Sequence, residues 1–186
     1  MISEAEVEVA ASATPAISPA VTVLPVSYAT ILDAPNSADL LRAYAEECLV
    51  PDAEPQRALY SAMERTGAIQ CFAAYLNSNP DSNPDSTPPL LIGFISVIRT
   101  IVLHDGHLIA GIESFYVDPD QRSTGAGLML LATAELYATD SGCRCLLCSA
   151  RIGSALDLIL ARRDGYERTH SQHTRWLNGY KGGRQA

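Results

Sequence analysis

The stretch IESFYVDPDQRSTGAGLMLLATAELYATDS, residues 112–141, decides the fold of this chain. Its first six residues are mostly branched, aromatic or apolar, which predicts a strand over 112–117. Asp118-Pro119-Asp120 ends that strand, because proline fixes φ and lacks an amide donor. From Leu128 onward, apolar residues recur three and four positions apart, which predicts a helix ending near Gly142. The stretch therefore predicts a strand, a glycine-containing turn and a long helix.

The turn carries Arg122, Gly125 and Gly127 in the spacing R-x-x-G-x-G. The first amides of a helix have no intrahelical partner, and the helix dipole makes that end positive, so the turn is suited to binding an anion. It is neither a P-loop, which needs Lys-Ser or Lys-Thr after its second glycine, nor a dinucleotide fingerprint, because Leu130 stands where the third glycine belongs. The alternative is that the two glycines only permit a tight turn.

Read as a whole, FYVDPDQRSTGAG at 115–127 resembles the signature of the GNAT superfamily, the acyl-CoA-dependent N-acyltransferases. That signature is a strand ending in valine, a short acidic or proline-containing turn, then R-x-x-G-x-G and a helix. The match is specific over the motif and weaker over 20–178, and it also resembles GNAT proteins carried by bacteriophages. The resemblance implies an α/β (α+β) GNAT fold, with a central mixed, mostly antiparallel sheet and helices on both faces.

The remaining pattern agrees with one such domain over 21–178. Hydrophobic periodicity and breakers predict strands at 21–26, 69–76, 90–98, 108–117 and 144–149, helices at 36–48, 54–65 and 154–162, and one or two terminal strands at 166–177. Residues 1–20 and 179–186 are expected to be flexible tails, and 77–89 a long hairpin loop. This order places helices on both faces of a mixed sheet.

The charge of the chain lies in its first hundred residues, where 12 acidic side chains accompany 4 arginines, while residues 101–186 hold 9 of each sign. The formal net charge of −8 argues against nucleic acid, which needs a basic patch. It is compatible with a cationic partner, and equally with a solvated acidic surface.

Several other classes of protein are excluded by composition. No apolar run approaches a membrane span, and the N-terminus does not read as a signal peptide. Five cysteines, an odd number, argue against a disulfide framework and favour a reducing cytoplasm. The four histidines lack the spacing of a metal site, so no metal is expected.

The resemblance also assigns a co-substrate, acetyl-CoA. It implies that the backbone of Phe115 and Val117 pairs with the pantetheine arm, that an amide of the same strand polarises the thioester carbonyl, and that the turn holds the pyrophosphate. Ser154 stands where the family often has an asparagine near the pantetheine. The expected co-substrate contacts are therefore Phe115, Val117, Arg122, Ser123, Thr124, Gly125, Ala126, Gly127 and Ser154.

Glu113 is the expected general base. Strict strand alternation puts it on the same face as Phe115 and Val117, in a sheet covered on both faces, where desolvation would favour its protonated form. The string Glu113-Ser114-Phe115-Tyr116-Val117 also resembles the Glu-Asp-Phe-Tyr-Val pattern of polyamine acetyltransferases, in which the matching glutamate is thought to help deprotonate the amine through water. The alternative is a glutamate paired with an arginine or exposed at the sheet edge.

The expected activity is direct transfer of an acetyl group from acetyl-CoA to a primary amine. The alternative is an acyl-CoA-binding module with weak or lost catalysis. It is suggested by Ala161, which stands where many GNAT enzymes have a tyrosine that acts as the general acid. A protein-interaction domain is the third reading. The acceptor is expected to be a small or peptidic cation, because residues 36–65 carry six acids against three arginines. A homodimer is compatible with these expectations.

Overall fold

The computed structural model describes residues 21–48, 54–77 and 89–169. Five strands form one sheet in the order β1-β2-β3-β4-β5, in which only the pair β4 and β5 is parallel. The strands are β1 (Val21–Val26), β2 (Ile69–Leu76), β3 (Leu90–Ile101), β4 (Leu108–Val117) and β5 (Leu146–Leu147). This is the mixed, mostly antiparallel sheet expected from the sequence.

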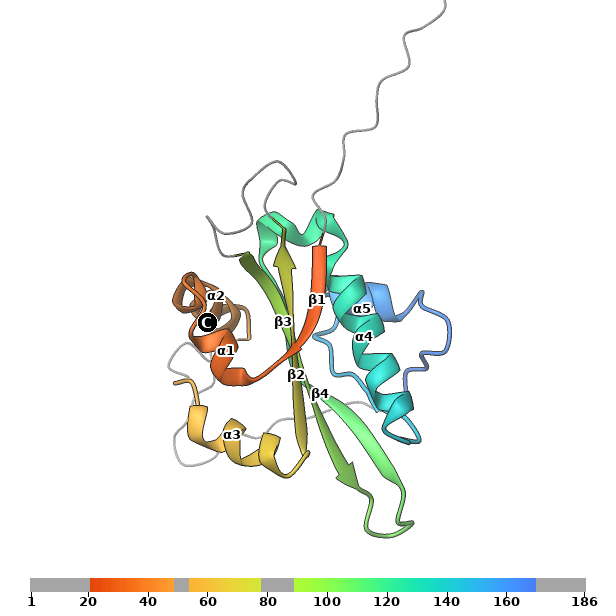
Figure 1. The fold of residues 1–186 in the computed structure, drawn as a ribbon. Helices are drawn as coiled ribbons and strands as arrows, with labels where there is room; N and C mark the ends of the chain where they lie inside the picture. Colours follow the sequence, from red (N-terminus) through yellow and green to blue (C-terminus); the bar gives the residue numbers. More distant parts are fainter. Residues whose placement is uncertain (1–20, 49–53, 78–88, 170–186) are drawn as a thin grey trace, which may run out of the picture.

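Helices cover both faces of the sheet (Figure 1). On one side lie α1 (Tyr28–Leu32), α2 (Ser37–Glu47) and α3 (Arg57–Arg65), and on the other α4 (Ala126–Asp140) and the short α5 (Ala155–Leu160). A 3₁₀ helix, η1 (Pro119–Thr124), connects β4 to α4. The far end of the β3–β4 hairpin projects beyond α3 and α4 in Figure 1.

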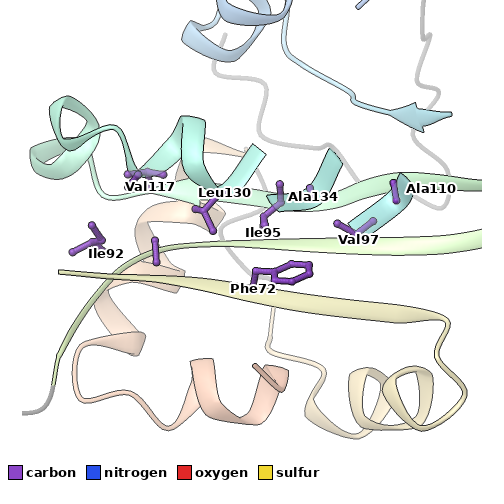
Figure 2. Close-up of a cluster of buried hydrophobic side chains, with 11 residues drawn as sticks. Phe72, Ile92, Ile95, Val97, Ala110, Val117, Leu130 and Ala134 are labelled. Carbon is purple, nitrogen blue, oxygen red and sulfur yellow. The ribbon is translucent and has the colours of Figure 1, made fainter. Parts of the chain in front are cut away.

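The core on the α4 side forms between the apolar face of α4 and the apolar residues of the strands beneath it. Leu130 and Ala134 of α4 are fully buried against Ile95 and Val97 of β3 and Phe72 of β2 (Figure 2). Small residues on the inner face of α4 let the helix approach the sheet closely. The sequence therefore places α4 firmly over the strands whose ends make the candidate site.

A second core on the opposite face is rich in aromatic rings. Tyr28, Phe94 and Tyr116 are buried there together with Ile31 and Leu91. The ring of Tyr44 on α2 meets those of Phe94 and Tyr116 at centroid distances of 5.3 and 5.9 Å. These edge-on contacts hold α2 against β3 and β4.

Several expected boundaries differ from the observed ones. The short helix α1 and the 3₁₀ helix η1 were not predicted, α3 begins at Arg57, and β3 continues to Ile101. The strand predicted over 144–149 pairs only at Leu146 and Leu147. The predicted tails 1–20 and 179–186, most of the 77–89 loop and most of the terminal strands over 166–177 lie outside the described residues.

Candidate active site

Among the described strands, none pairs with the second half of β4 on its outer edge. β4 pairs with β5 at Ala110 and Gly111 only, while its antiparallel pairing with β3 continues to Val117. Within the described ranges, no strand pairs with 112–117 on the β5 side. The side chains of Phe115 and Val117 pack into the α4-side core, so what they present at this edge is their backbone. An extended ligand can use such an edge for strand-like hydrogen bonds.

The turn between β4 and α4 has the expected geometry. Gly125 has φ +83°, a left-handed conformation that glycine adopts without strain, and no side chain caps the N-terminus of α4. The amide of Ala126 makes only a long 3.4 Å bond to Thr124 Oγ1. A Cβ on Gly127 would lie 3.7 Å from Phe115 and Val117, an ordinary contact. The first backbone amides of α4 therefore have no side-chain cap among the described residues and can donate to an anion.

Arg122 is already engaged in the structure. Its Nη2 lies 2.5 Å from Glu47 Oε2 at the end of α2, and its Nε donates to the carbonyl of Val117 at 3.1 Å. Its guanidinium also lies over the ring of Tyr116. Arg122 thus stands at the turn, but a carboxylate from the other side of the sheet neutralises it, and its role toward acetyl-CoA stays a prediction.

Ser123 and Thr124 form the last residues of η1, and Ala126 is buried beneath the turn. The Thr124 hydroxyl donates to the carbonyl of Gln121 at 2.7 Å, which closes the 3₁₀ helix. Ser154 caps α5, its Oγ accepting from the amide of Asp157 at 3.2 Å. These contacts shape the turn and α5, and the role of each residue toward acetyl-CoA remains a prediction.

The expectation that Glu113 shares a face with Phe115 and Val117 is wrong. The register of β3 and β4 shifts between Ser96 and Val97, so that β4 has one extra residue there. Ile112 and Phe115 both pack on the α4-side core, although three positions separate them. The bulge therefore sends Glu113 to the opposite face, where α3 lies.

Glu113 is also exposed, so the burial on which the sequence argument depended is absent. The hydroxyl of Tyr60, on α3, donates to Glu113 Oε2 at 2.5 Å. The ring of Tyr60 stacks on that of Tyr28 with centroids 3.7 Å apart. Burial first, and then the bond to Glu113, raise the pKa of Tyr60 well above its ordinary 10.0. The phenol therefore stays protonated and holds the carboxylate in place.

Tyr60 was not predicted as a site residue, because it lies within the helix expected over 54–65 and no sequence signal links it to Glu113. Ser114, next to Glu113 on the bulge, was also missed as a polar feature. Its Oγ is buried and has no hydrogen-bond partner among the described residues. The available signal was the pair Glu113-Ser114 in an otherwise apolar strand. The bulge that turns both side chains toward α3 depends on pairing with β3, which the sequence does not show.

The end of α5 is fixed to α4 by an ion pair. Arg163 donates two bonds to Glu135, at 2.7 and 2.6 Å, and Tyr166 donates a third at 3.0 Å. The bond from Arg163 lowers the pKa of Glu135. Arg163 and Tyr166 thus anchor the end of α5 to α4. A shallow pocket of about 350 Å³ lies between Leu128, Leu158 and Arg162.

The described residues hold no group of three or more His, Cys, Asp or Glu side chains that is arranged to bind a metal ion. Among the same residues, no helix has the length and apolar character needed to cross a membrane.

Comparison with known proteins gives one family. The model of the Acetyltransferase (GNAT) family matches residues 38–154, more than half of the chain. No curated protein sequence matches. Strands β2 to β5 and the turn before α4 lie inside the matched range, and β1 precedes it.

Solved structures share the fold at low identity. An aminoglycoside acetyltransferase from an uncultured soil metagenomic sample has a TM-score of 0.62 and 15% identity, covering 85% of this chain and 97% of its own. The ribosomal-protein-alanine N-acetyltransferase of Brucella melitensis biovar Abortus has a TM-score of 0.59 and 18% identity, covering 86% and 100%. A transcriptional regulator of Bacillus halodurans has a TM-score of 0.59 and 16% identity, covering 85% and 100%.

Proposed function

Because the chain belongs to the Acetyltransferase (GNAT) family, we propose that it transfers an acetyl group from acetyl-CoA to a primary amine by direct attack. The observation that carries this proposal is the position of Glu113. Its carboxylate stands on the strand whose open edge continues into the uncapped end of α4. The proposed base and the backbone edge proposed for the acyl donor thus belong to the same strand, β4.

The donor side fits coenzyme A by the chemistry of its residues. The open backbone of Phe115 and Val117 suits the pantetheine amides, and the amides from Arg122 to Gly127 suit the pyrophosphate. Glycine at 127 leaves the surface above Phe115 free of a side chain. Ser154 remains a proposed contact at the start of α5. Acetyl-CoA supplies the thioester.

In this proposal Arg122 leaves Glu47 and pairs with the pyrophosphate of the co-substrate. Glu47 neutralises it in the structure, and a pyrophosphate at the turn offers two negative charges in place of one carboxylate. The amides and the glycines of the turn therefore provide the site, and Arg122 strengthens it once Glu47 has moved away.

The acceptor side is the face of α1, α2 and α3. The acceptor amine must lose a proton before its nitrogen attacks the thioester carbonyl, and we assign that proton to Glu113. The C–N bond then forms, the tetrahedral oxyanion collapses, and the C–S bond breaks. Because Ala161 offers no acid, the thiolate takes its proton from water. Tyr60 keeps the Glu113 carboxylate oriented throughout.

A cationic acceptor remains part of the proposal, and the charge that supports it is the Glu113 carboxylate. Asp39 pairs with Arg42, Asp33 with Arg57, and Glu47 with Arg122, so several acids of this region are already neutralised. Glu113 makes no ion pair among the described residues and carries the attraction for an ammonium group.

The test is acetyl transfer from acetyl-CoA to a panel of primary amines, followed by thiol release and by the mass of the product. Acetylated amine with wild-type protein, and its loss with Glu113→Gln, is the expected result. Formation of free coenzyme A without any acetylated amine contradicts the proposal.

A second function is favoured by one observation, the alanine at 161. An acyl-CoA-binding module needs the open edge and the turn but no acid. Tight coenzyme binding by calorimetry, together with no transfer to any amine of the panel, selects this alternative.

A further inference from the structure

A second pocket lies beside Glu113, on the same face of the sheet. It has a volume of about 240 Å³ and is lined by eight residues of the sheet: Ile98, Thr100, Ile109, Ala110, Gly111, Ile112, Glu113 and Leu147. The pocket spans β3, β4 and β5 at the point where β5 ends. Apart from Glu113, its lining is apolar with one hydroxyl.

The register places this pocket on the acceptor face. Leu146 packs into the α4-side core, so Leu147, the next residue on the strand, points to the other face. Gly111 pairs with both Leu147 and Ile98, and residues directly opposite each other in a sheet point the same way. Glu113 joins them only because the bulge turns it away from α4.

Gly111 makes room in the floor of the pocket. A Cβ on it would meet no atom of the described residues within 4 Å. Its φ lies outside the left-handed region, so glycine is not required here for its backbone conformation. Leucine 147 is 49% exposed at the rim. In the described part of the chain, the space above Gly111 is therefore available to a ligand and is not filled by core side chains.

The pocket combines a carboxylate at one end with an apolar body, which is complementary to an ammonium group on a short apolar skeleton. Its volume lies below the roughly 300–1,000 Å³ of sites for drug-sized ligands, so it suits one ring or a short alkyl chain. A polyamine or a sugar-based polycation finds one carboxylate among these lining residues and no second acidic side chain for its other charges.

We propose that the acceptor is a small primary amine with a single apolar group, which enters this pocket while its nitrogen lies at Glu113. The inference rests on the proposed acetyl transfer and narrows its acceptor. In the bound state the apolar group covers Gly111, Ile98 and Leu147, and the ammonium gives its proton to Glu113 before attack. Burial of the apolar group supplies affinity, and the carboxylate supplies orientation.

The test uses 2-phenylethylamine as the probe, with 2-phenylethanol as its neutral isostere and 1,3-diaminopropane as a polar diamine. Binding to the coenzyme-A complex is measured by calorimetry, and acetylation is measured with acetyl-CoA. Gly111→Val fills the pocket on a strand that accepts valine. Ile101→Ala, on the same hairpin but outside the pocket lining, is the control. Leu147→Lys places a cation at the exposed rim and serves as a second variant if Gly111→Val does not fold.

Wild-type protein should bind 2-phenylethylamine more tightly than either comparison compound. Gly111→Val or Leu147→Lys should weaken that binding about tenfold or more, and Ile101→Ala should leave it unchanged. If 2-phenylethylamine does not bind, or binds Gly111→Val and Leu147→Lys as tightly as wild type, the acceptor assignment is overturned. Acetylation of 1,3-diaminopropane in that case leaves the proposed function intact. Binding as expected without acetylation of any amine supports the pocket and contradicts the proposed function.

Discussion

The Tyr60 hydroxyl donates a 2.5 Å hydrogen bond to Glu113 Oε2 and joins the outer helix α3 to the bulge of β4. The two residues are 53 positions apart in the chain. Tyr60 is held from its other side by the stacked ring of Tyr28. A rigid aromatic pair therefore fixes the orientation of the proposed base, while its second oxygen stays available to a substrate.

Tyr60→Phe should lower kcat about tenfold, the equivalent of one hydrogen bond to a charged group, without changing coenzyme binding. Tyr28→Phe is the matched control, because it also loses a phenol but keeps the stack. Steady-state kinetics of the double variant Tyr60→Phe/Glu113→Gln tests whether Tyr60 acts through Glu113. If Tyr60 acts through Glu113, the double variant is no slower than Glu113→Gln alone, whereas additive losses contradict the positioning role.

Glu113→Gln should lower kcat by roughly 10²-fold or more, because the amide cannot take a proton from the amine. Calorimetric affinity for coenzyme A should stay unchanged, since the side chain faces away from Phe115 and Val117. Glu46→Gln, an exposed glutamate on α2, is the control for the loss of one negative charge. Full activity of Glu113→Gln would place the base elsewhere.

Gly127→Asp should abolish coenzyme A binding in calorimetry, because it brings a negative side chain to the first turn of α4. Gly127→Ala should bind nearly as wild type, since the added Cβ makes only 3.7 Å contacts. This pair is sharper than a substitution at Gly125, whose φ of +83° makes any side chain there strained. Equal affinity of the Asp and Ala variants would remove the turn from the site.

Glu47→Gln should raise the affinity for coenzyme A by a few-fold, because it removes the carboxylate that competes for Arg122. Both side chains are about half exposed, so the pair contributes only about 0.2–1 kcal/mol. The gain should shrink as salt rises, since screening weakens the competition. Arg122→Gln, in contrast, should weaken binding. A loss of affinity in Glu47→Gln would mean that the ion pair helps to shape the turn.

Glu135→Gln should lower the free energy of unfolding at neutral pH by about 1–2 kcal/mol, because Arg163 and Tyr166 lose a charged acceptor. The folded-state pKa of Glu135 is lowered from its ordinary 4.5, so its contribution is complete above that value and is lost as pH falls below it. Thermal unfolding of wild type and variant should therefore converge in acid. A constant difference across pH would assign the effect to packing.

The sequence predicted the glycine turn, the strand before it and the helix after it well, because all three depend on local signals. The strand predicted over 108–117 was confirmed at both ends, and the helix predicted after the glycine turn runs from Ala126 to Asp140. Glycine and proline restrict the backbone whatever surrounds them, and a helical period twelve or more residues long is hard to misread.

What the sequence could not show depends on pairing between distant segments. The strict alternation that placed Glu113 beside Phe115 fails at one extra residue, which exists only relative to β3. Tyr60 and Glu47 become site neighbours through the packing of α3 and α2. The expected strand over 144–149 is short because β5 leaves β4 after Gly111.

The bulge also has a consequence for how the site can be engineered. The side of the sheet on which Glu113 lies is set by the number of residues in β4 and not by their identity. Libraries of substitutions at 113 and 114 therefore vary the chemistry of the acceptor side while leaving the donor side in place. Deleting one residue before Phe115 would restore regular alternation and bring the donor and acceptor faces out of step, so length variants in this strand are expected to inactivate the protein where most single replacements do not.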